Sequence, residues 1–315
     1  MSCLKIEELS VRYSTSSGAL TAVDRVSLDL CPPPSSQALA LVGETGCGKT
    51  TLALAVLGLL PANAEASGRV LYEGRNLLDL SEREWSRLRG DRISAVLQNP
   101  SLALNPVYTI GHQIGEVFRI HRGDRRDDAY QKAAALLERM KLGDVKRRLA
   151  MYPHQFSEGM NQRVLIAAAV ALKPRILVAD EPTKGLDADL KSAVIEELRI
   201  AGAESETALF LITHDLDAAG ILCGRIAVMY AGEIVEQAEA RAFFAEPKHP
   251  YAQALLDSLP ERGFLAIPGH PPALTAPPQG CRFHPRCPRR MEACRDIRPE
   301  TSTDAGWEVR CHLYR

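Results

Sequence analysis

The sequence has no excess of charge of either sign. Its 315 residues carry 38 basic and 39 acidic side chains, which leaves a formal net charge of -1. Proteins that bind nucleic acid through its phosphates carry a basic footprint, and this composition shows none. The balance of basic and acidic residues therefore argues against nucleic acid as a partner. A chain with this balance can still carry local charged patches.

Long apolar runs are also missing. The longest covers residues 164–172, ends at Lys173 and Pro174, and is far too short to span a bilayer. The amino terminus, MSCLKIEELSVRY, alternates charged and apolar residues as a strand does and shows no signal peptide. If the protein acts at a membrane, we expect it to act from the membrane surface.

Internal repeats are absent as well, but the composition changes once along the chain. The hydrophobic content of 46% is enough to bury one substantial core and a smaller second unit. From about Phe243 the sequence becomes rich in proline. We therefore predict one domain over residues 1–242 and a small carboxyl-terminal extension over residues 243–315.

The first of these domains has the pattern of an α/β fold. Short β segments come first, and a helical pattern follows between about residues 100 and 172. The runs RILVAD and TALFLIT are continuously apolar, which is typical of buried parallel strands. A helical pattern from Asp187 to about Ala201 separates them, and RIAVMYAGEIVEQ completes the domain.

The segment GETGCGKT fits the P-loop pattern G-x-x-x-x-G-K-[ST], between a predicted strand and a predicted helix. The glycines let backbone N–H groups curl around phosphates, and the following helix points its positive end at them. Lys49 adds a cation for the γ-phosphate, and the Thr50 hydroxyl is a ligand for Mg²⁺. The predicted ATP-binding residues are Gly43, Glu44, Thr45, Gly46, Cys47, Gly48, Lys49, Thr50 and Thr51.

Two further strands end in polar residues. ILVADEP delivers Asp180 and Glu181 to a strand end, where ligands of α/β proteins bind. Asp180 suits the coordination shell of Mg²⁺, and Glu181 suits the deprotonation of an attacking water. LITHDL places Thr213 and His214 in the same way, and we predict that His214 contacts the γ-phosphate.

In their order and spacing, these motifs resemble the ATPase subunits of ABC transporters. The segments that carry the resemblance are GETGCGKT, VLQNP, FSEGMNQRV, ILVADEP, KGLDA and LITHDL, within about residues 1–240. The resemblance implies a P-loop ABC-type nucleotide-binding domain with a mixed sheet core and a helical subdomain. It also implies ATP and Mg²⁺ as cofactors and hydrolysis of ATP as the reaction.

Other segments are similar to the peptide- and nickel-importer branch of that family. They are SLALNPVYTIG, YPHQFSEGMNQRV, KHPYAQALLDSLP and GCRFHPRCP. The resemblance implies a second, unlike ATPase subunit, two membrane permease subunits and an extracytoplasmic solute-binding protein. It places the chain at the cytoplasmic face of the inner membrane. The solute is not encoded in an ATPase subunit; peptides are the first expectation, and nickel or a metal–chelator complex is the second.

The resemblance also assigns roles to residues. Gln98 would sense Mg²⁺ and the attacking water and would share the Mg²⁺ shell with Thr50 and Asp180, in a loop that touches the membrane subunit. Tyr13 would stack on adenine, although a half-buried strand tyrosine is an alternative. Asp187 would belong to the D-loop at the subunit interface. The signature motif, which acts on the partner's ATP, would comprise Ser157, Glu158, Gly159, Met160 and Gln162.

Two positions depart from the family pattern. Where the family has S-G-G, the chain has Ser157-Glu158-Gly159, so a carboxylate stands where the signature would approach the partner's ATP. A carboxylate about 5 Å from a phosphate charge costs about 3 kcal/mol at an effective dielectric of about 20. As a purely structural alternative, Ser157 caps the helix and Glu158 favours its dipole. The second departure is Lys184-Gly185, for which we offer no interpretation.

Four of the eight cysteines, Cys281, Cys287, Cys294 and Cys311, are in the extension. Their spacing is neither a zinc-ribbon nor a common ferredoxin pattern, so spacing alone leaves metal binding and free thiols open. The family resemblance favours a 4Fe–4S cluster, with Zn²⁺ as the alternative.

Two rival functions are compatible with parts of the sequence. The first is a soluble ABC-type ATPase acting on nucleic acid or ribosomes, against which the neutral charge and the single ATPase unit argue. The second is a subunit that binds ATP without hydrolysing it. Lys49, Asp180, Glu181 and His214 argue against that possibility.

Overall fold

The structure is a computed structural model that describes residues 4–16, 18–30, 38–205, 207–304 and 306–314. The chain divides into two compact units. The first unit combines residues 1–79 with residues 211–315, and the second comprises residues 80–210. The predicted domain boundary at residue 243 stays a prediction, because the division into units follows other positions.

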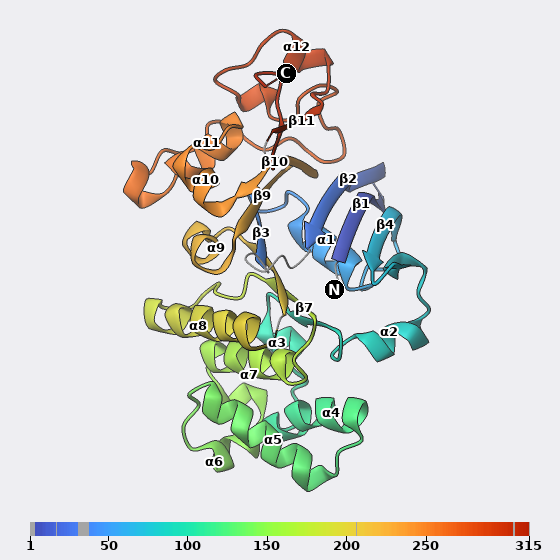
Figure 1. Ribbon diagram of the computed structural model, residues 1–315, viewed down its shortest axis with the longest axis vertical. Helices are drawn as coiled ribbons and strands as arrows, with labels where there is room; N and C mark the ends of the chain where they lie inside the picture. The colour runs from blue at the N-terminus through green and yellow to red at the C-terminus, as the bar shows by residue number, and fades with distance from the viewer. Residues whose placement is uncertain (1–3, 17, 31–37, 206, 305, 315) are drawn as a thin grey trace. The chain divides into compact units, whose positions relative to one another are not determined.

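The first unit contains a small antiparallel sheet at the amino-terminal end of the chain, coloured blue to cyan in Figure 1. Its strand order is β2-β1-β4-β5, and β1 pairs with both β2 and β4. The apolar side chains that alternate along β1, including Leu4, Ile6 and Val11, are fully buried. The bounds are β1 Leu4–Thr15, β2 Gly18–Leu30, β4 Ala64–Tyr72 and β5 Arg75–Asn76, followed by the short 3-10 turn η1 Leu77–Asp79.

A second sheet in this unit is mixed, as the sequence predicts. β3 (Ala38–Val42) pairs in parallel with β9 (Arg225–Tyr230), and β9 continues antiparallel into β10 (Glu233–Glu239). β12 (Trp307–Arg310) and β11 (Thr301–Asp304) extend the sheet beyond β10. The carboxyl-terminal residues of the chain therefore join the same sheet as the strand that precedes the P-loop.

The carboxyl-terminal segment buries an aromatic cluster within this unit. Phe283 is 1% exposed and lies between Tyr230, Tyr251 and His249, with ring centroids 5.2–5.9 Å apart. Complete burial lowers the pKa of His249 to about 3, so its ring stays neutral and accepts a hydrogen bond from the Tyr251 N–H. The helical elements of the first unit are α1 Lys49–Val56, α9 Leu216–Leu222, α10 Ala240–Ala245, α11 Pro250–Asp257, η3 Pro260–Arg262, η4 His284–Arg286 and α12 Ala293–Asp296.

The second unit has a parallel strand pair and a group of helices. β6 (Ile93–Val96) pairs with β7 (Ile176–Asp180), and every residue of β7 is buried, as its continuous apolar sequence predicts. β8 (Ala208–Thr213) begins in this unit and ends in the first. The helical elements are α2 Glu82–Leu88, α3 Pro100–Ala103, α4 Ile110–Arg122, α5 Arg126–Arg139, α6 Val145–Leu149, η2 Pro153–Gln155, α7 Glu158–Val170 and α8 Ala188–Ser205.

The helical region predicted over about residues 100–172 is confirmed by helices α3 to α7. α4, α5 and α6 lie together in Figure 1, and both α4 and α5 contact α7. On α5 the buried residues Ala133 and Leu137, followed by Met140 at its end, form an apolar stripe at helical spacing. None of the helices within the described ranges is both long and apolar enough to cross a membrane.

Candidate functional site

The P-loop follows β3 and ends at the first turn of α1, as predicted. Three of its glycines have positive φ: 154° at Gly43, 83° at Gly46 and 109° at Gly48. A Cβ at Gly43 would lie 2.2 Å from the Met229 carbonyl oxygen, and a Cβ at Gly48 would lie 2.2 Å from that of Ala22. A Cβ at Gly46 would meet nothing within 4 Å. Gly43 and Gly48 are therefore required because backbone carbonyl oxygens lie too close for a side chain. Gly46 is favoured only by its positive φ.

The side chain of Lys49, the first residue of α1, folds back onto the start of the P-loop. Its ammonium donates to the carbonyl oxygens of Gly43 at 2.8 Å and Glu44 at 3.0 Å, and the side chain is buried. Nearby, the Tyr13 hydroxyl lies 3.3 Å from the Thr51 hydroxyl. Tyr13 is thus beside the first turn of α1, and its stacking on adenine stays a prediction.

Glu44 has contacts that the sequence did not indicate. Its backbone N–H donates to the Tyr251 hydroxyl at 2.9 Å, and its carboxylate pairs with Arg286 from the extension. The sequence separations are 207 and 242 residues, so no local pattern signals either contact. Burial of Cys47 raises the pKa of its thiol, which is consistent with a small, uncharged loop residue.

His214 lies between β8 and α9 in the first unit. It is exposed, and the residues on either side fix the backbone around it. The Asp215 N–H donates to the Thr213 hydroxyl at 2.9 Å, and the Asp215 carboxylate accepts from the Ala218 N–H at the start of α9. The strand-end position predicted for His214 is confirmed, and its contact with a γ-phosphate stays a prediction.

Asp180 and Glu181 lie in the second unit, at the carboxyl end of β7. Asp180 is 2% exposed and Glu181 is 9% exposed. Glu181 has a φ of 50°, in the left-handed region that residues other than glycine seldom occupy. Backbone strain of this kind is concentrated at functional sites.

Gln98 follows β6 and precedes α3, with an exposed side chain. Two apolar side chains in the chain segment that follows Gln98 face solvent: Leu102 is 84% exposed and Val107 is 71% exposed. A pocket of about 440 Å³ opens in the same region of the second unit. It is lined by Asn99, Leu104, Pro106, Pro153, His154, Phe156, Glu158 and Asn161.

The predicted signature residues form the start of α7. Ser157 is its N-cap, with its hydroxyl accepting from the Met160 N–H at 3.3 Å, as expected. Gly159 is buried, and a Cβ there would lie 2.6 Å from Leu190 of α8. Gln162 is also buried, one turn further along the helix. A side chain at position 159 would therefore require the end of the Leu190 side chain to shift.

Glu158 is exposed at the first position of α7. Its carboxylate lies beside Gly185, with Oε1 3.6 Å from the place that a Cβ of Gly185 would take. Gly185 itself has a φ of 74°. The two departures from the family pattern, Glu158 and Gly185, are therefore neighbours in the second unit.

Asp187 has a local structural role. Its carboxylate accepts from the Leu190 N–H at 2.9 Å, and its carbonyl oxygen accepts from the Lys191 N–H at 2.8 Å. These contacts cap α8 at its amino-terminal end. The D-loop role predicted for Asp187 stays a prediction.

The predicted residues thus divide between the two units. The first unit contains the P-loop, Tyr13 and His214, and the second contains Gln98, Asp180, Glu181, the signature residues and Asp187. Tyr13 lies within β1, whereas Asp180, Glu181 and His214 occupy the strand ends that the sequence predicts.

The four cysteines of the extension are free thiols. Cys281, Cys294 and Cys311 are buried, and Cys287 is half-buried. Burial raises the pKa of Cys281 to about 12 and also raises the pKa values of Cys287 and Cys311. Among the residues that the structure describes, no three metal-ligating side chains form a group that could hold a metal ion. Two other cysteines, Cys3 and Cys31, lie outside the described residues.

Two protein-family models match the chain. The model described as "ABC transporter" matches residues 23–184. The model described as "Oligopeptide/dipeptide transporter, C-terminal region" matches residues 235–294.

Curated relatives match over almost the whole chain. The oligopeptide transport ATP-binding protein OppD of Salmonella typhimurium is 39% identical over 96% of this chain and 91% of its own length. The dipeptide transport ATP-binding protein DppD of Escherichia coli is 39% identical over 99% of this chain and 97% of its own length.

Solved structures show the same fold. A dimeric structure of the bacterial ABC transporter cassette MJ0796 aligns with a TM-score of 0.67 and 25% identity, over 76% of this chain and 99% of that one. A post-hydrolysis dimer of the same cassette, bound to ADP and phosphate, aligns with a TM-score of 0.66 and 24% identity, with the same coverage. The predicted P-loop α/β fold is therefore confirmed.

We predict that Gly43→Ala and Gly48→Ala each abolish ATP binding, because the added Cβ would overlap a backbone carbonyl oxygen. Gly46→Ala is the matched control: it meets no neighbour, and its strained φ costs about 1–2 kcal/mol. Binding of a fluorescent ATP analogue to each folded variant measures the difference. Equal losses in all three variants would contradict the requirement for close backbone approach.

Proposed function

The chain belongs to the ABC transporter family and is an ATPase of that family, and we propose that it is the ATP-hydrolysing subunit of a peptide importer. The observation that carries the proposal is the P-loop between β3 and α1, with Lys49 held over its carbonyl oxygens. The match of the oligopeptide/dipeptide carboxyl-terminal region to residues 235–294 supports the importer branch.

ATP would bind with its phosphates against the backbone N–H groups of the P-loop. Lys49 would contact the γ-phosphate, and the exposed Thr50 would supply a hydroxyl ligand to Mg²⁺. Gln98 and Asp180 would complete the protein's share of the Mg²⁺ shell. The metal would neutralise charge that develops on the phosphates during transfer to water.

Glu181 would act as the general base. Its buried position at the end of β7, beside Asp180, and its positive φ support this role. It would accept a proton from the attacking water, and His214 would hold the γ-phosphate. Together these roles favour a hydrolysing subunit over one that only binds ATP.

Peptide uptake is supported over nickel uptake by the relatives. Both relatives reported above are named for transport of peptides, one for oligopeptides and one for dipeptides. In such an assembly the chain would lie at the cytoplasmic face of the membrane, beneath two permease subunits, and an extracytoplasmic binding protein would deliver the peptide. The exposed Leu102 and Val107, beside the pocket near Gln98, suit an apolar segment of a permease.

We predict that Glu181→Gln lowers ATP hydrolysis by the assembled complex at least about 10²-fold, because it removes the proton acceptor. ATP binding should persist, since the P-loop is unchanged. Steady-state hydrolysis and binding of ATP to the same preparation measure both effects. Unchanged hydrolysis would contradict the assignment of Glu181 and with it the proposed mechanism.

Glu158 supports the pairing of this chain with an unlike ATPase subunit. Because it is exposed at the start of α7, its charge would face ATP bound to the partner's P-loop and not ATP bound to this chain. We propose that this chain's own Walker site hydrolyses ATP, while the partner's site mainly holds ATP or lacks it. The carboxylate of Glu158, which lies beside Gly185, would weaken the partner's site by repelling the phosphates.

For the assembled pair, Glu158→Gly should speed turnover or tighten ATP binding at the partner's site, because a charge of the same sign as the phosphates is removed. Glu158→Gln is a useful companion, since it removes the charge and keeps the bulk. Site-resolved nucleotide binding, with the partner's P-loop lysine intact or replaced, distinguishes the two sites. No change at either site would contradict the asymmetric arrangement.

The four cysteines would hold a 4Fe–4S cluster or, alternatively, Zn²⁺. The support for this proposal is the family resemblance of the extension that carries the four cysteines. Because the described residues form no assembled group of ligands, the proposal requires the sulfur atoms to move closer together on binding.

Analysis of iron, sulfide and zinc in anaerobically purified full-length protein tests the metal proposal. We expect about four iron and four sulfide per chain for the cluster, or about one zinc for the alternative. Cys294→Ser should lower that content. A folded chain that lacks all three elements would contradict the proposal and leave the four residues as structural thiols.

A further inference from the structure

Arg286 is a buried arginine whose carboxylate partner is a P-loop residue. Its side chain is 4% exposed, and that of Glu44 is 25% exposed. Nη1 lies 2.7 Å from Glu44 Oε2, and Nη2 lies 3.0 Å from Glu44 Oε1. The two parallel hydrogen bonds form the bidentate arrangement that guanidinium and carboxylate groups favour.

The remaining donors of Arg286 also have partners. Nε donates to the Pro268 carbonyl oxygen at 2.8 Å, and Nη1 donates to the Tyr230 hydroxyl at 3.2 Å. The hydrogen bonds to Glu44 raise the pKa of Arg286. Because a buried cation without a counter-charge is strongly destabilising, the position of Arg286 and the direction of Glu44 depend on each other.

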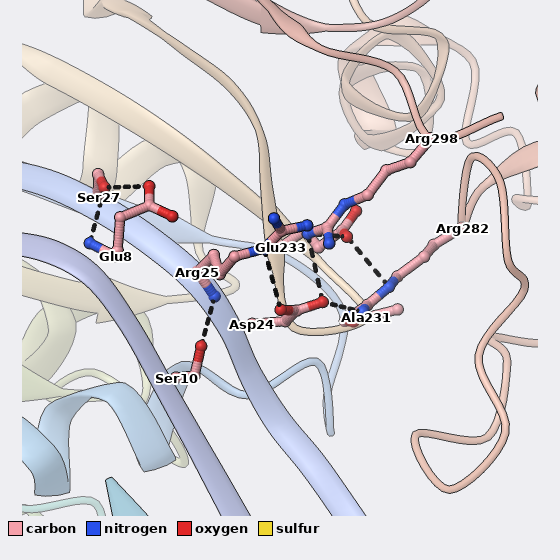
Figure 2. A network of polar contacts seen from close by, with 9 residues as sticks. All are labelled: Glu8, Ser10, Asp24, Arg25, Ser27, Ala231, Glu233, Arg282 and Arg298. Atoms are coloured by element: carbon pink, nitrogen blue, oxygen red, sulfur yellow. Dashed lines mark hydrogen bonds and ion pairs between the residues drawn. The ribbon is translucent and has the colours of Figure 1, made fainter. Parts of the chain in front are cut away.

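A second arginine of the extension, Arg282, contacts the turn at Ala231 and Gly232, which is hydrogen-bonded to the P-loop. Figure 2 shows Arg282 donating to the Ala231 carbonyl oxygen and pairing with Asp24 and Glu233. The next residue in the turn, Gly232, donates from its N–H to the carbonyl oxygen of Cys47 at 2.8 Å. Arg282 therefore reaches the P-loop through one intervening turn, whereas Arg286 reaches it directly.

We propose that the segment Cys281–Arg286 positions the P-loop for phosphate binding, with Arg286 as the positioning residue acting through Glu44. The inference deepens the proposed ATPase function and rests on it. Paired with Arg286, the Glu44 carboxylate is neutralised and turned toward the extension. Released from Arg286, it would be a free anion beside the phosphate site, and the loop would lose one of its fixed contacts.

The test measures the Kd for MgATP of the full-length chain with Arg286 or Glu44 altered. Arg286→Gln should raise the Kd about tenfold or more, because a charged hydrogen-bonded pair is lost and an anion is left beside the phosphates. Adding Glu44→Gln to Arg286→Gln should restore several-fold of that loss by removing the anion. Arg295→Gln, which alters a side chain of the same extension that is 80% exposed, should bind MgATP as the wild type does.

The rescue distinguishes positioning from general support of the fold. If Arg286 only stabilised the extension, the double variant would bind MgATP no better than Arg286→Gln, and that result would overturn the proposal. In the assembled complex, the KM for ATP should rise while kcat at saturating ATP changes little, since binding and not chemistry is affected. An unchanged Kd in Arg286→Gln would also overturn the proposal.

Arg286→Lys supplies the same comparison if the glutamine variant does not fold. It keeps the charge but cannot contact both carboxylate oxygens in the planar geometry of a guanidinium, so the Kd should rise about threefold or more. A wild-type Kd in this variant would overturn the proposal. If the wild-type chain itself failed to bind MgATP, the proposed function would fail, which is a different outcome from equal binding by wild type and variants.

Discussion

The phosphate-binding loop packs so closely against the backbone of two other strands that there is no room for side chains at two of its positions. The carbonyl oxygens of Met229 and Ala22 occupy the space that side chains at positions 43 and 48 would need. This close approach explains why glycines stand at these two positions, and why the loop passes straight from β3 into α1. The strand β9 and the part of β2 around Ala22 therefore help to shape the phosphate-binding loop.

Buried charges connect the carboxyl-terminal segment to this arrangement. Arg282, Arg286 and Arg298 come from the last 35 residues of the chain. Each pairs with a carboxylate elsewhere in the first unit: Asp24, Glu44 or Glu233. Burial raises the pKa of Glu233, and the neighbouring arginines oppose that rise. Since each charge would be costly alone, the extension and the phosphate loop are stabilised as one arrangement.

Local sequence patterns predicted most of the individual elements. The P-loop, the buried strands that end at Asp180 and Thr213, and the helix capped by Ser157 are each specified within about ten residues of chain, and the structure confirms them. The pairing of Arg286 with Glu44 was not predicted, because it joins residues 242 positions apart and both side chains look like ordinary surface charges in the sequence. The neighbouring positions of Glu158 and Gly185 were missed for the same reason. The cysteine spacing left metal binding open, and only the family resemblance favoured a cluster. Among the described residues no three ligating side chains form a group that could hold a metal ion, since spacing does not fix how sulfur atoms converge.

Amide hydrogen exchange across the P-loop is the most direct test of the claim that the extension holds this loop in its phosphate-binding shape. Peptides that cover residues 43–48 should exchange at least about tenfold faster in Arg286→Gln than in the wild type, while peptides that cover β7 should exchange at the same rate in both. Equal exchange in the P-loop would contradict the claim. So would an increase of the same size throughout the chain, because that would indicate general destabilisation and no specific hold on the phosphate site.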